Sequence, residues 1–185
     1  MHPLMVKAVA ETAAVVRGVK PDQMSAPTPC RDWDVRVLAN HLLQVAVALR
    51  LAGRGEAVPG GLWADDLLTG DWAARFEDET RQAIAAWAEP SAWDGVVDMG
   101  GSAMPAGLAA TMLVSDLVIH GWDLARATGQ DYRCDDDVAE LAYRFVAQTG
   151  EQGRAMGIYA EPVPVADDAS MLERAVAISG RNPSR

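Results

Sequence analysis

The sequence predicts an all-α protein built as a bundle of five or six helices. Apolar residues recur at spacings of three and four over several long segments, which is typical of amphipathic helices. The chain has almost no strand signal, and the only strand-like run of residues 95–105 is VVDM. Half of the 185 residues are hydrophobic, so we expect one domain over residues 1–185 with a sizeable core.

Three helices are expected in the first half of the chain. The first spans about residues 3–19, because Pro3 suits the first turn of a helix. After the loop KPDQMSAPTPCRDW, Asp34 is a suitable N-cap for a second helix over about 34–52. One face of that second helix carries Val35, Leu38, His41, Leu42, Val45 and Leu49. A third helix follows over about 71–87, after a glycine-rich connection.

The second half of the chain predicts two more long helices and a short one. Residues 95–105 are expected to be irregular or briefly extended. A fourth helix spans about 106–127, and Gly129 is placed to terminate it in the left-handed conformation. A fifth helix over about 135–150 begins with the run DDD, which suits the positive end of the helix dipole. The last helix spans about 169–179, after a proline-rich loop.

Composition excludes several classes of partner. The formal net charge is −10 and the pI is about 4.6, so the chain would be repelled by nucleic acid and by an anionic membrane surface. No segment reaches the roughly 18 uninterrupted apolar residues of a membrane helix. The N-terminus lacks the features of a signal peptide, and two cysteines are too few for a disulfide framework. We therefore expect a cytoplasmic protein with neither a nucleic-acid partner nor a membrane partner.

The stretch DLVIHGWDLA places two ionisable residues inside the fourth expected helix. Asp116 and His120 lie four positions apart, so they project from one face with Cβ atoms about 5–6 Å apart. The same face carries the apolar residues Ala109, Leu113, Leu124 and Ala127, so the pair is expected to point inward and not to solvent. A buried carboxylate is costly unless it is paired or bound to a metal.

His41 lies on the apolar face of the second helix, so it is also expected to point inward. His41, Asp116 and His120 together would form a three-ligand metal site with room for water or substrate. Two imidazoles and one carboxylate suit catalytic zinc, and they also suit nickel or iron. From spacing alone an alternative stays open: each histidine is a satisfied core residue, and Asp116 and His120 are a metal-free buried pair.

Three segments of the chain carry a family resemblance. They are APTPCRDWDVRVLANHLL at 26–43, SDLVIHGWDLARATGQ at 115–130 and ERAVAISGRNP at 173–183. These segments resemble the signatures of the mycothiol-dependent maleylpyruvate isomerase family and its actinobacterial relatives, within the DinB/YfiT-like metal-binding superfamily. The resemblance extends over nearly the whole chain, and the first two motifs are specific when taken together.

The resemblance implies a DinB-like four-helix bundle, with one or two additional short helices and a divalent metal in its core. The matching ligand positions are His41, Asp116 and His120, and zinc is favoured over nickel or iron. Asp116 departs from the pattern, because related isomerases usually have glutamate there and DinB-type proteins have histidine. Aspartate is one methylene shorter and can still bind a metal, although a weaker or different mode of binding is left open.

Several other residues have two interpretations. Cys30 is either a thiol nucleophile or part of a structural turn, and the resemblance favours the turn. Trp33 and Trp122 flank the ligand segments and are interpreted as packing residues first and pocket walls second. Cys134 lies next to an acidic run that disfavours a thiolate, so this thiol is expected to be inert. His2 lies near a terminus that we expect to fray, and it is not expected to be a ligand.

Asp123, Arg126 and Arg181 are candidates for supporting roles. Asp123 lies three residues after His120, so it either orients that ligand or pairs with Arg126. Arg126 and Arg181 are candidates for holding a carboxylate of a cofactor or substrate, because a guanidinium matches that group bidentately. A surface role for each arginine is the favoured interpretation.

Two functions from different classes agree with these residues. The first is a metal-dependent S-transferase or isomerase-like enzyme that uses a low-molecular-weight thiol such as mycothiol on an electrophilic substrate. The resembled isomerases carry an additional C-terminal domain for which this chain has no room, so a thiol transferase is favoured. The alternative is a non-catalytic bundle that binds or senses a metal. In either case, apolar outer stripes are expected to allow a homodimer.

Overall fold

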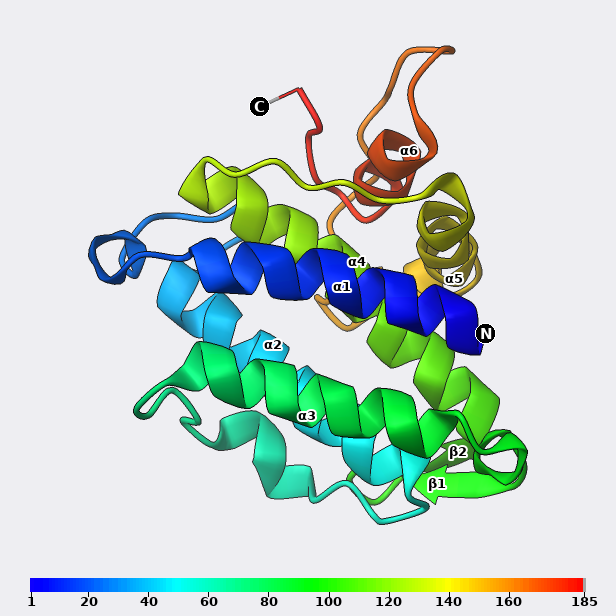
Figure 1. The fold of residues 1–185 in the computed structure, drawn as a ribbon. Helices are drawn as coiled ribbons and strands as arrows, with labels where there is room; N and C mark the ends of the chain where they lie inside the picture. Colours follow the sequence, from blue (N-terminus) through cyan, green and yellow to red (C-terminus); the bar gives the residue numbers. More distant parts are fainter. Residues whose placement is uncertain (185) are drawn as a thin grey trace.

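The computed structural model describes residues 1–184, and it confirms the all-α prediction. The main elements are α1 (His2–Gly18), α2 (Val35–Gly53), α3 (Trp72–Trp87), α4 (Ala106–Thr128), α5 (Asp136–Ala155) and α6 (Met171–Ile178) (Figure 1). Three 3-10 turns lie between them: η1 (Pro21–Gln23), η2 (Gly60–Ala64) and η3 (Pro90–Trp93). The architecture is a DinB-like helical bundle.

Helix α4 is the centre of the bundle. It packs against α2 and α1 on one side and against α5 on another, while α3 packs against α1 and α2 (Figure 1). Helix α6 packs against α5 at the end of the chain. Every residue of α4 from Leu113 to Ala125 is buried except Asp116. The site region therefore rests on the most constrained helix of the protein.

Local signals mark several helix ends, and those at Asp34 and Gly129 were predicted from the sequence. The Asp34 carboxylate accepts a hydrogen bond from the Val37 backbone N–H at 2.9 Å, so it caps α2. Gly129 ends α4 with φ 69° and ψ 31°, a left-handed conformation that glycine adopts without a steric cost. Ser170 begins α6 in a reciprocal capping box with Glu173.

The structure corrects two predictions of local structure and refines a third. Helix α5 continues to Ala155, five residues past its predicted end at Gly150, and Gly153 in this added turn is buried against the Tyr159 ring. The segment 95–105, expected to be irregular or briefly extended, forms an antiparallel hairpin of β1 (Val96–Asp98) and β2 (Ala103–Pro105), which confirms the extended alternative. The N-terminus forms the first turn of α1 and is not frayed.

Two helices are long and apolar enough to cross a membrane by length and composition. They are α2 and α4, but 67% and 78% of their most apolar windows are buried inside the bundle. The apolar character of both helices is accounted for by their position in the core.

Candidate metal centre

Helices α2 and α4 bring His41, Asp116 and His120 together. The Nε2 atom of His41 lies 3.0 Å from Oδ2 of Asp116, and Nε2 of His120 lies 3.6 Å from Oδ1 of the same carboxylate. One donor atom from each residue lies within 4.8 Å of the other two. All three residues that the sequence singled out therefore meet at one point, although 75 positions separate His41 from Asp116.

The three residues differ in their exposure to solvent. His120 is 7% exposed, as its inward position predicts. The side chains of His41 and Asp116 are 19% and 33% exposed, so the expectation that Asp116 is shielded from solvent is wrong. Asp116 lies at the edge of the apolar stripe of α4 and not at its centre. Asp116 is therefore the most exposed of the three side chains in the cluster.

The Asp116 carboxyl is held in its ionised form. Burial raises its pKa, but the hydrogen bond from His41 and the electrostatic interactions with the two imidazoles outweigh burial, so the net pKa is lowered. An ionised carboxylate can only accept hydrogen bonds, so Nε2–H of His41 donates to Oδ2 of Asp116.

On the opposite side of its ring, His120 is fixed by Asp123. The Nδ1–H group of His120 donates to Oδ2 of Asp123 at 2.9 Å, because the Asp123 carboxylate can only accept. Burial raises the pKa of Asp123, but the hydrogen bond from His120 and the Arg181 charge outweigh burial, so the net pKa is lowered. With the proton on Nδ1, the lone pair of Nε2 faces Asp116. Of the two roles predicted for Asp123, the orienting one is what this geometry shows.

Arg181 completes the buried arrangement. Its Nη2 donates to Oδ2 of Asp123 at 2.9 Å, and its Nε lies 3.3 Å from both carboxylate oxygens. Arg181 is 7% exposed, so the surface role favoured for it is wrong. It holds a carboxylate, as a guanidinium can, but the carboxylate belongs to the protein itself.

Two tryptophans form the walls of the cluster. The Trp33 ring stacks on His120 with centroids 5.5 Å apart and meets His41 edge-on at 5.0 Å. The ring of Trp63, from η2, lies 5.9 Å from that of His41. Trp33 was expected to pack first and line a pocket second, and it contacts both proposed ligands. Trp63 was missed, because the connection that carries it has little periodicity.

A hydrogen-bonded turn positions Trp33. The Thr28 hydroxyl donates to the Trp33 carbonyl at 3.0 Å and accepts from the Cys30 N–H at 3.2 Å. Asp32 adopts φ 66°, a conformation that Asp tolerates better than most residues. Burial raises the pKa of the Cys30 thiol to about 11, so it is protonated at neutral pH. These features support the structural interpretation of Cys30.

A second donor set overlaps the first and shares His120. One donor atom each from Cys30, His120 and Asp123 also lie within 4.8 Å of one another. This set suits a cation poorly, because the thiol is protonated and Asp123 already accepts from both His120 and Arg181. The Arg181 guanidinium would also repel a metal placed there. The His41, Asp116 and His120 set is the better candidate.

Comparison with known proteins places the chain in a family. Residues 6–125 match the family model described as "Mycothiol maleylpyruvate isomerase N-terminal domain". The chain belongs to this family. An uncharacterized Mycobacterium tuberculosis protein, found in two strains, is 28% identical over 190 residues and matches 98% of each chain.

Two solved structures share the fold of this family member. The crystal structure of the mycothiol-dependent maleylpyruvate isomerase has a TM-score of 0.61 at 19% identity, with 82% of this chain and 70% of that chain covered. A mutant of that isomerase gives a TM-score of 0.57 at 16% identity, with the same coverage. At these identities the likeness shows the fold alone.

Tyr159 lies close enough to Asp116 for the two side chains to interact electrostatically. It lies in the connection between α5 and α6, and its ring packs so closely on Gly153 that a Cβ there would lie 2.4 Å from Cδ2. Burial raises the pKa of the Tyr159 hydroxyl, and the negative charge of Asp116 raises it further. Tyr159 was not predicted, because its loop has no periodicity.

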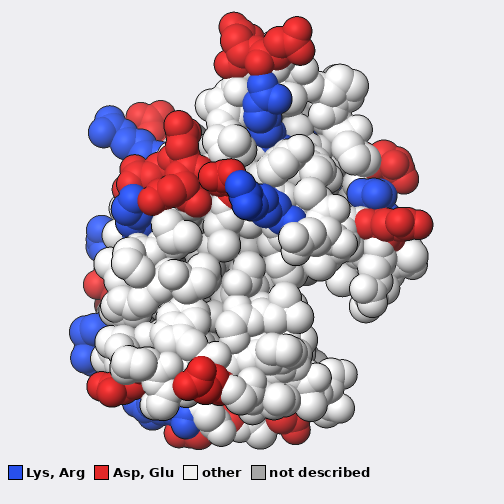
Figure 2. Space-filling view, turned by 90° about the vertical axis from the view of Figure 1, so that its right-hand side faces the viewer, with Lys and Arg blue, Asp and Glu red and all other residues white. Residues whose placement is uncertain are grey.

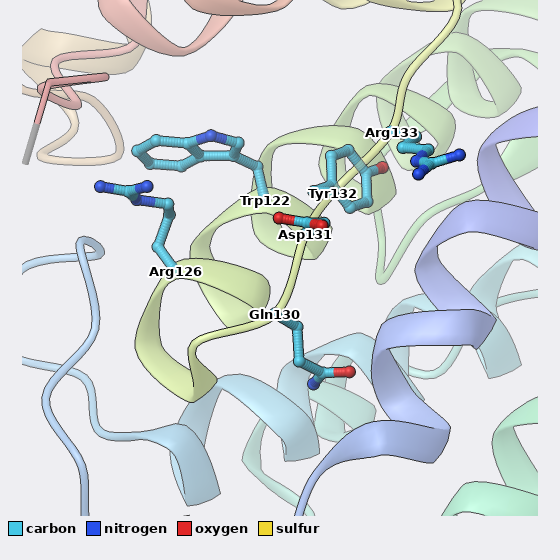
Figure 3. A pocket seen from close by; sticks show the side chains of 6 residues that line it. All are labelled: Trp122, Arg126, Gln130, Asp131, Tyr132 and Arg133. Atoms are coloured by element: carbon cyan, nitrogen blue, oxygen red, sulfur yellow. The ribbon is translucent and has the colours of Figure 1, made fainter.

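Two cavities lie near the C-terminal end of α4. Figure 3 shows the first, of about 310 Å³, with the side chains of Trp122, Arg126, Gln130, Asp131, Tyr132 and Arg133 around it. The Arg126 guanidinium lies 5.9 Å from the centroid of the Trp122 ring. The second cavity, of about 440 Å³, lies between residues 27–29 and 180–182 and also borders Arg126. Trp122 therefore lines the first cavity, which contains none of the three proposed metal ligands.

The remaining candidates do not join the cluster. His2 uses Nε2 to bind the carbonyl oxygen of Ile84 at 3.0 Å, so it is engaged elsewhere, as expected for a non-ligand. Burial and the nearby Asp135 raise the pKa of Cys134 to about 12, which agrees with the prediction that this thiol is inert.

Proposed function

We propose that the protein is a metal-dependent enzyme that joins a low-molecular-weight thiol, such as mycothiol, to an electrophilic substrate in the cytoplasm. The observation that carries this proposal is that the two ring nitrogens of His120 have different surroundings. His120 is fixed on its Nδ1 side by a buried carboxylate, and its Nε2 side faces a partly exposed carboxylate and a second histidine.

The donor set fits a divalent metal. Ligand atoms about 2.0–2.1 Å from a tetrahedral zinc ion lie about 3.3 Å from one another. The Nε2 atom of His41 lies 3.0 Å from Oδ2 of Asp116, and Nε2 of His120 lies 3.6 Å from Oδ1, so both spacings are close to that value, each to a different carboxylate oxygen. His41, Asp116 and His120 would hold the ion, with His41 carrying its proton on Nδ1, and a fourth position would stay open. Zinc is the favoured ion, and nickel and iron accept the same ligands.

The chain's own residues supply orientation and shielding. Asp123 and Arg181 hold the His120 ring in one tautomer, which supports its role as a ligand. Trp33 and Trp63 cover the histidine rings and limit the access of water. A bound metal would lower the pKa of a coordinated thiol and hold it as the thiolate near neutral pH.

The simplest reaction is addition of the thiol to an activated double bond. A sulfur–carbon bond forms, the carbon–carbon π bond breaks, and the thiol proton ends on the neighbouring carbon, so no oxidant or reductant is needed. Reversal after rotation about the new single bond would give isomerisation. Retention of the adduct would give S-transfer.

The test is elemental analysis of the untagged protein beside His41→Ala and His120→Ala. We expect about one equivalent of a divalent metal in the wild type, lost in both variants. His2→Ala is the matched control, because His2 binds a backbone carbonyl elsewhere. An absence of metal in the wild type after addition of zinc or nickel would overturn the ligand assignment.

The catalytic part of the proposal needs a separate assay. Conjugation of mycothiol to a generic electrophile should require both the thiol and the metal. Thiol binding without turnover over a broad panel of electrophiles would favour the alternative, a non-catalytic metal-binding or sensing bundle.

A further inference from the structure

The connection between α2 and α3 (residues 54–71) brings an exposed indole to the metal cluster. Trp63 lies in η2 and is 39% exposed, and its ring centroid lies 5.9 Å from that of His41. Its neighbour Leu62 is buried in the hydrophobic core, so η2 is anchored while the indole stays at the surface. An indole in this position offers a large apolar face to a molecule bound beside His41.

Two amide side chains of α2, Asn40 and Gln44, hold this connection in place. The Asp65 carbonyl accepts from Nδ2 of Asn40 at 2.9 Å and from Nε2 of Gln44 at 2.8 Å. Oδ1 of Asn40 also accepts from the Leu67 N–H at 2.7 Å. His41 lies between the two amides in the sequence of α2, so one turn of this helix supplies the ligand and fixes the segment that carries the indole.

The two amides are better suited to fix the connection than the ion pair beside them. Gln44 is 3% exposed, and a buried amide that lost its partner would be costly. Arg36 also joins α2 to the connection, through Asp66 at 2.7 Å, but both of these side chains are more than half exposed. An ion pair in such a position contributes little, because water and salt screen it.

The start of the connection is fixed by the hairpin. The Val58 N–H donates to the Asp98 carbonyl at 2.8 Å, which joins the connection to β1. Gly60 lies against Gly100, where a Cβ on Gly60 would be 3.5 Å from the carbonyl oxygen. With η2 held on both sides, the indole has its position before a ligand arrives, and binding does not have to order it.

We propose that Trp63 contacts the molecule bound at the open position of the metal cluster, and that Asn40 and Gln44 position its ring. This inference rests on the proposed function and adds one residue that touches the ligand and two that act through it. An aromatic group on the ligand would gain about fivefold in affinity from the indole.

The first test compares two uncharged thiols on the zinc-loaded full chain by titration calorimetry. Acidic side chains gather in several groups on the surface (Figure 2), and the net charge is −10, so an anionic probe would add long-range repulsion. Phenylmethanethiol carries a ring that the indole can contact, whereas 2-mercaptoethanol does not. We expect Trp63→Ala to weaken binding of phenylmethanethiol by about fivefold and that of 2-mercaptoethanol by less than about twofold.

Asn40→Ala tests whether the position of the indole matters. It keeps Trp63 but frees the connection, so it should reduce the preference for phenylmethanethiol by a similar factor. Adding Asn40→Ala to Trp63→Ala should reduce the preference no further, because residues that act through one group are not additive. Arg36→Ala is the matched control, since it removes an exposed bond to the same connection and should leave the preference unchanged. If Asn40→Ala does not fold, Gln44→Leu removes the other amide bond to the same carbonyl.

The second test uses the metal-free protein. Diethyl pyrocarbonate modifies accessible imidazoles, and peptide mass spectrometry reads His41 against His2, which binds a backbone carbonyl elsewhere. We expect Trp63→Ala and Asn40→Ala each to raise the ratio of His41 to His2 modification by about threefold, because each uncovers one face of the His41 ring. The double variant should match Trp63→Ala.

Each part of the proposal has a result that would overturn it. An unchanged thiol preference in Trp63→Ala, or zinc-loaded protein that binds neither thiol, would overturn the contact with the ligand. Additive effects of the two variants, or wild-type behaviour of both amide variants, would overturn the positioning role. Failure to bind zinc would refute the proposed function and the ligand contact, whereas the metal-free test would still decide whether the amides position Trp63.

Discussion

The two sides of the His120 ring are built differently. On the Nδ1 side, Asp123 and Arg181 form a buried pair in which the carboxylate and the guanidinium are both hydrogen-bonded. On the Nε2 side, Asp116 and His41 are partly exposed and make a single mutual hydrogen bond. The closed side fixes the ring, and the open side leaves donor atoms that can exchange their partners. Function is expected on the open side and stability on the closed one.

Breaking the closed side should have the largest effect on folding. Asp123→Asn removes one charge from a buried pair and leaves the Arg181 guanidinium uncompensated. We expect a loss of about 3–5 kcal/mol in the free energy of unfolding. Urea denaturation of the metal-free protein measures it. A loss below about 1 kcal/mol would show that the pair is hydrated and that the two sides do not differ as described.

The Cys30 thiol reports on access to the closed side. Because its pKa is raised to about 11, the reactive thiolate is scarce at pH 8 and increases about tenfold per pH unit up to that value. In a Cys134→Ser background, alkylation by iodoacetamide at pH 8 should be about 100-fold slower than in urea-unfolded protein. Equal rates would mean that the turn around Cys30 opens readily.

The helix that supplies His41 depends on a local cap. Asp34→Ala removes the acceptor for the Val37 N–H and should cost about 1 kcal/mol in the free energy of unfolding. The effect should be smaller than that of Asp123→Asn, because the freed N–H lies at an exposed helix end where water can replace the carboxylate. Thermal denaturation of the two variants side by side makes the comparison, and a reversed order would contradict it.

Breaking the open side should have the smallest effect on folding. Asp116→Asn keeps the shape of the side chain, and its pair with His41 is partly exposed, so we expect a change below about 1 kcal/mol in the metal-free protein. The same variant should lose most of its bound metal, measured by elemental analysis. A stability loss as large as that of Asp123→Asn would favour the metal-free buried pair as the role of Asp116.

Features determined by neighbours in sequence were predictable. The caps at Asp34 and Gly129 and the shared face of Asp116 and His120 follow from helix geometry, which repeats every few residues. Helix ends without such signals were not predictable. The end of α5 is an example, since the helix continues past Gly150 to Ala155, and Gly153 is buried against the Tyr159 ring.

Features that join distant segments were only partly predictable. His41 could be linked to the α4 residues because both helices carry ionisable groups on apolar faces. The pairing of Arg181 with Asp123 spans 58 residues, and an arginine in a turn gives no sign of burial. Trp63 also comes from a connection without a repeating pattern, so nothing local indicated that its ring lies beside that of His41.

By itself, then, the sequence determined the helices, their apolar faces and the three candidate ligands, because those depend on a helical period that is written locally in the chain. Tertiary structure decided which side of His120 is closed and which side opens to solvent. These properties depend on how α2, α4, the turn at 28–33 and the C-terminal turn pack together, and burial of one segment is fixed by residues that lie far from it in sequence.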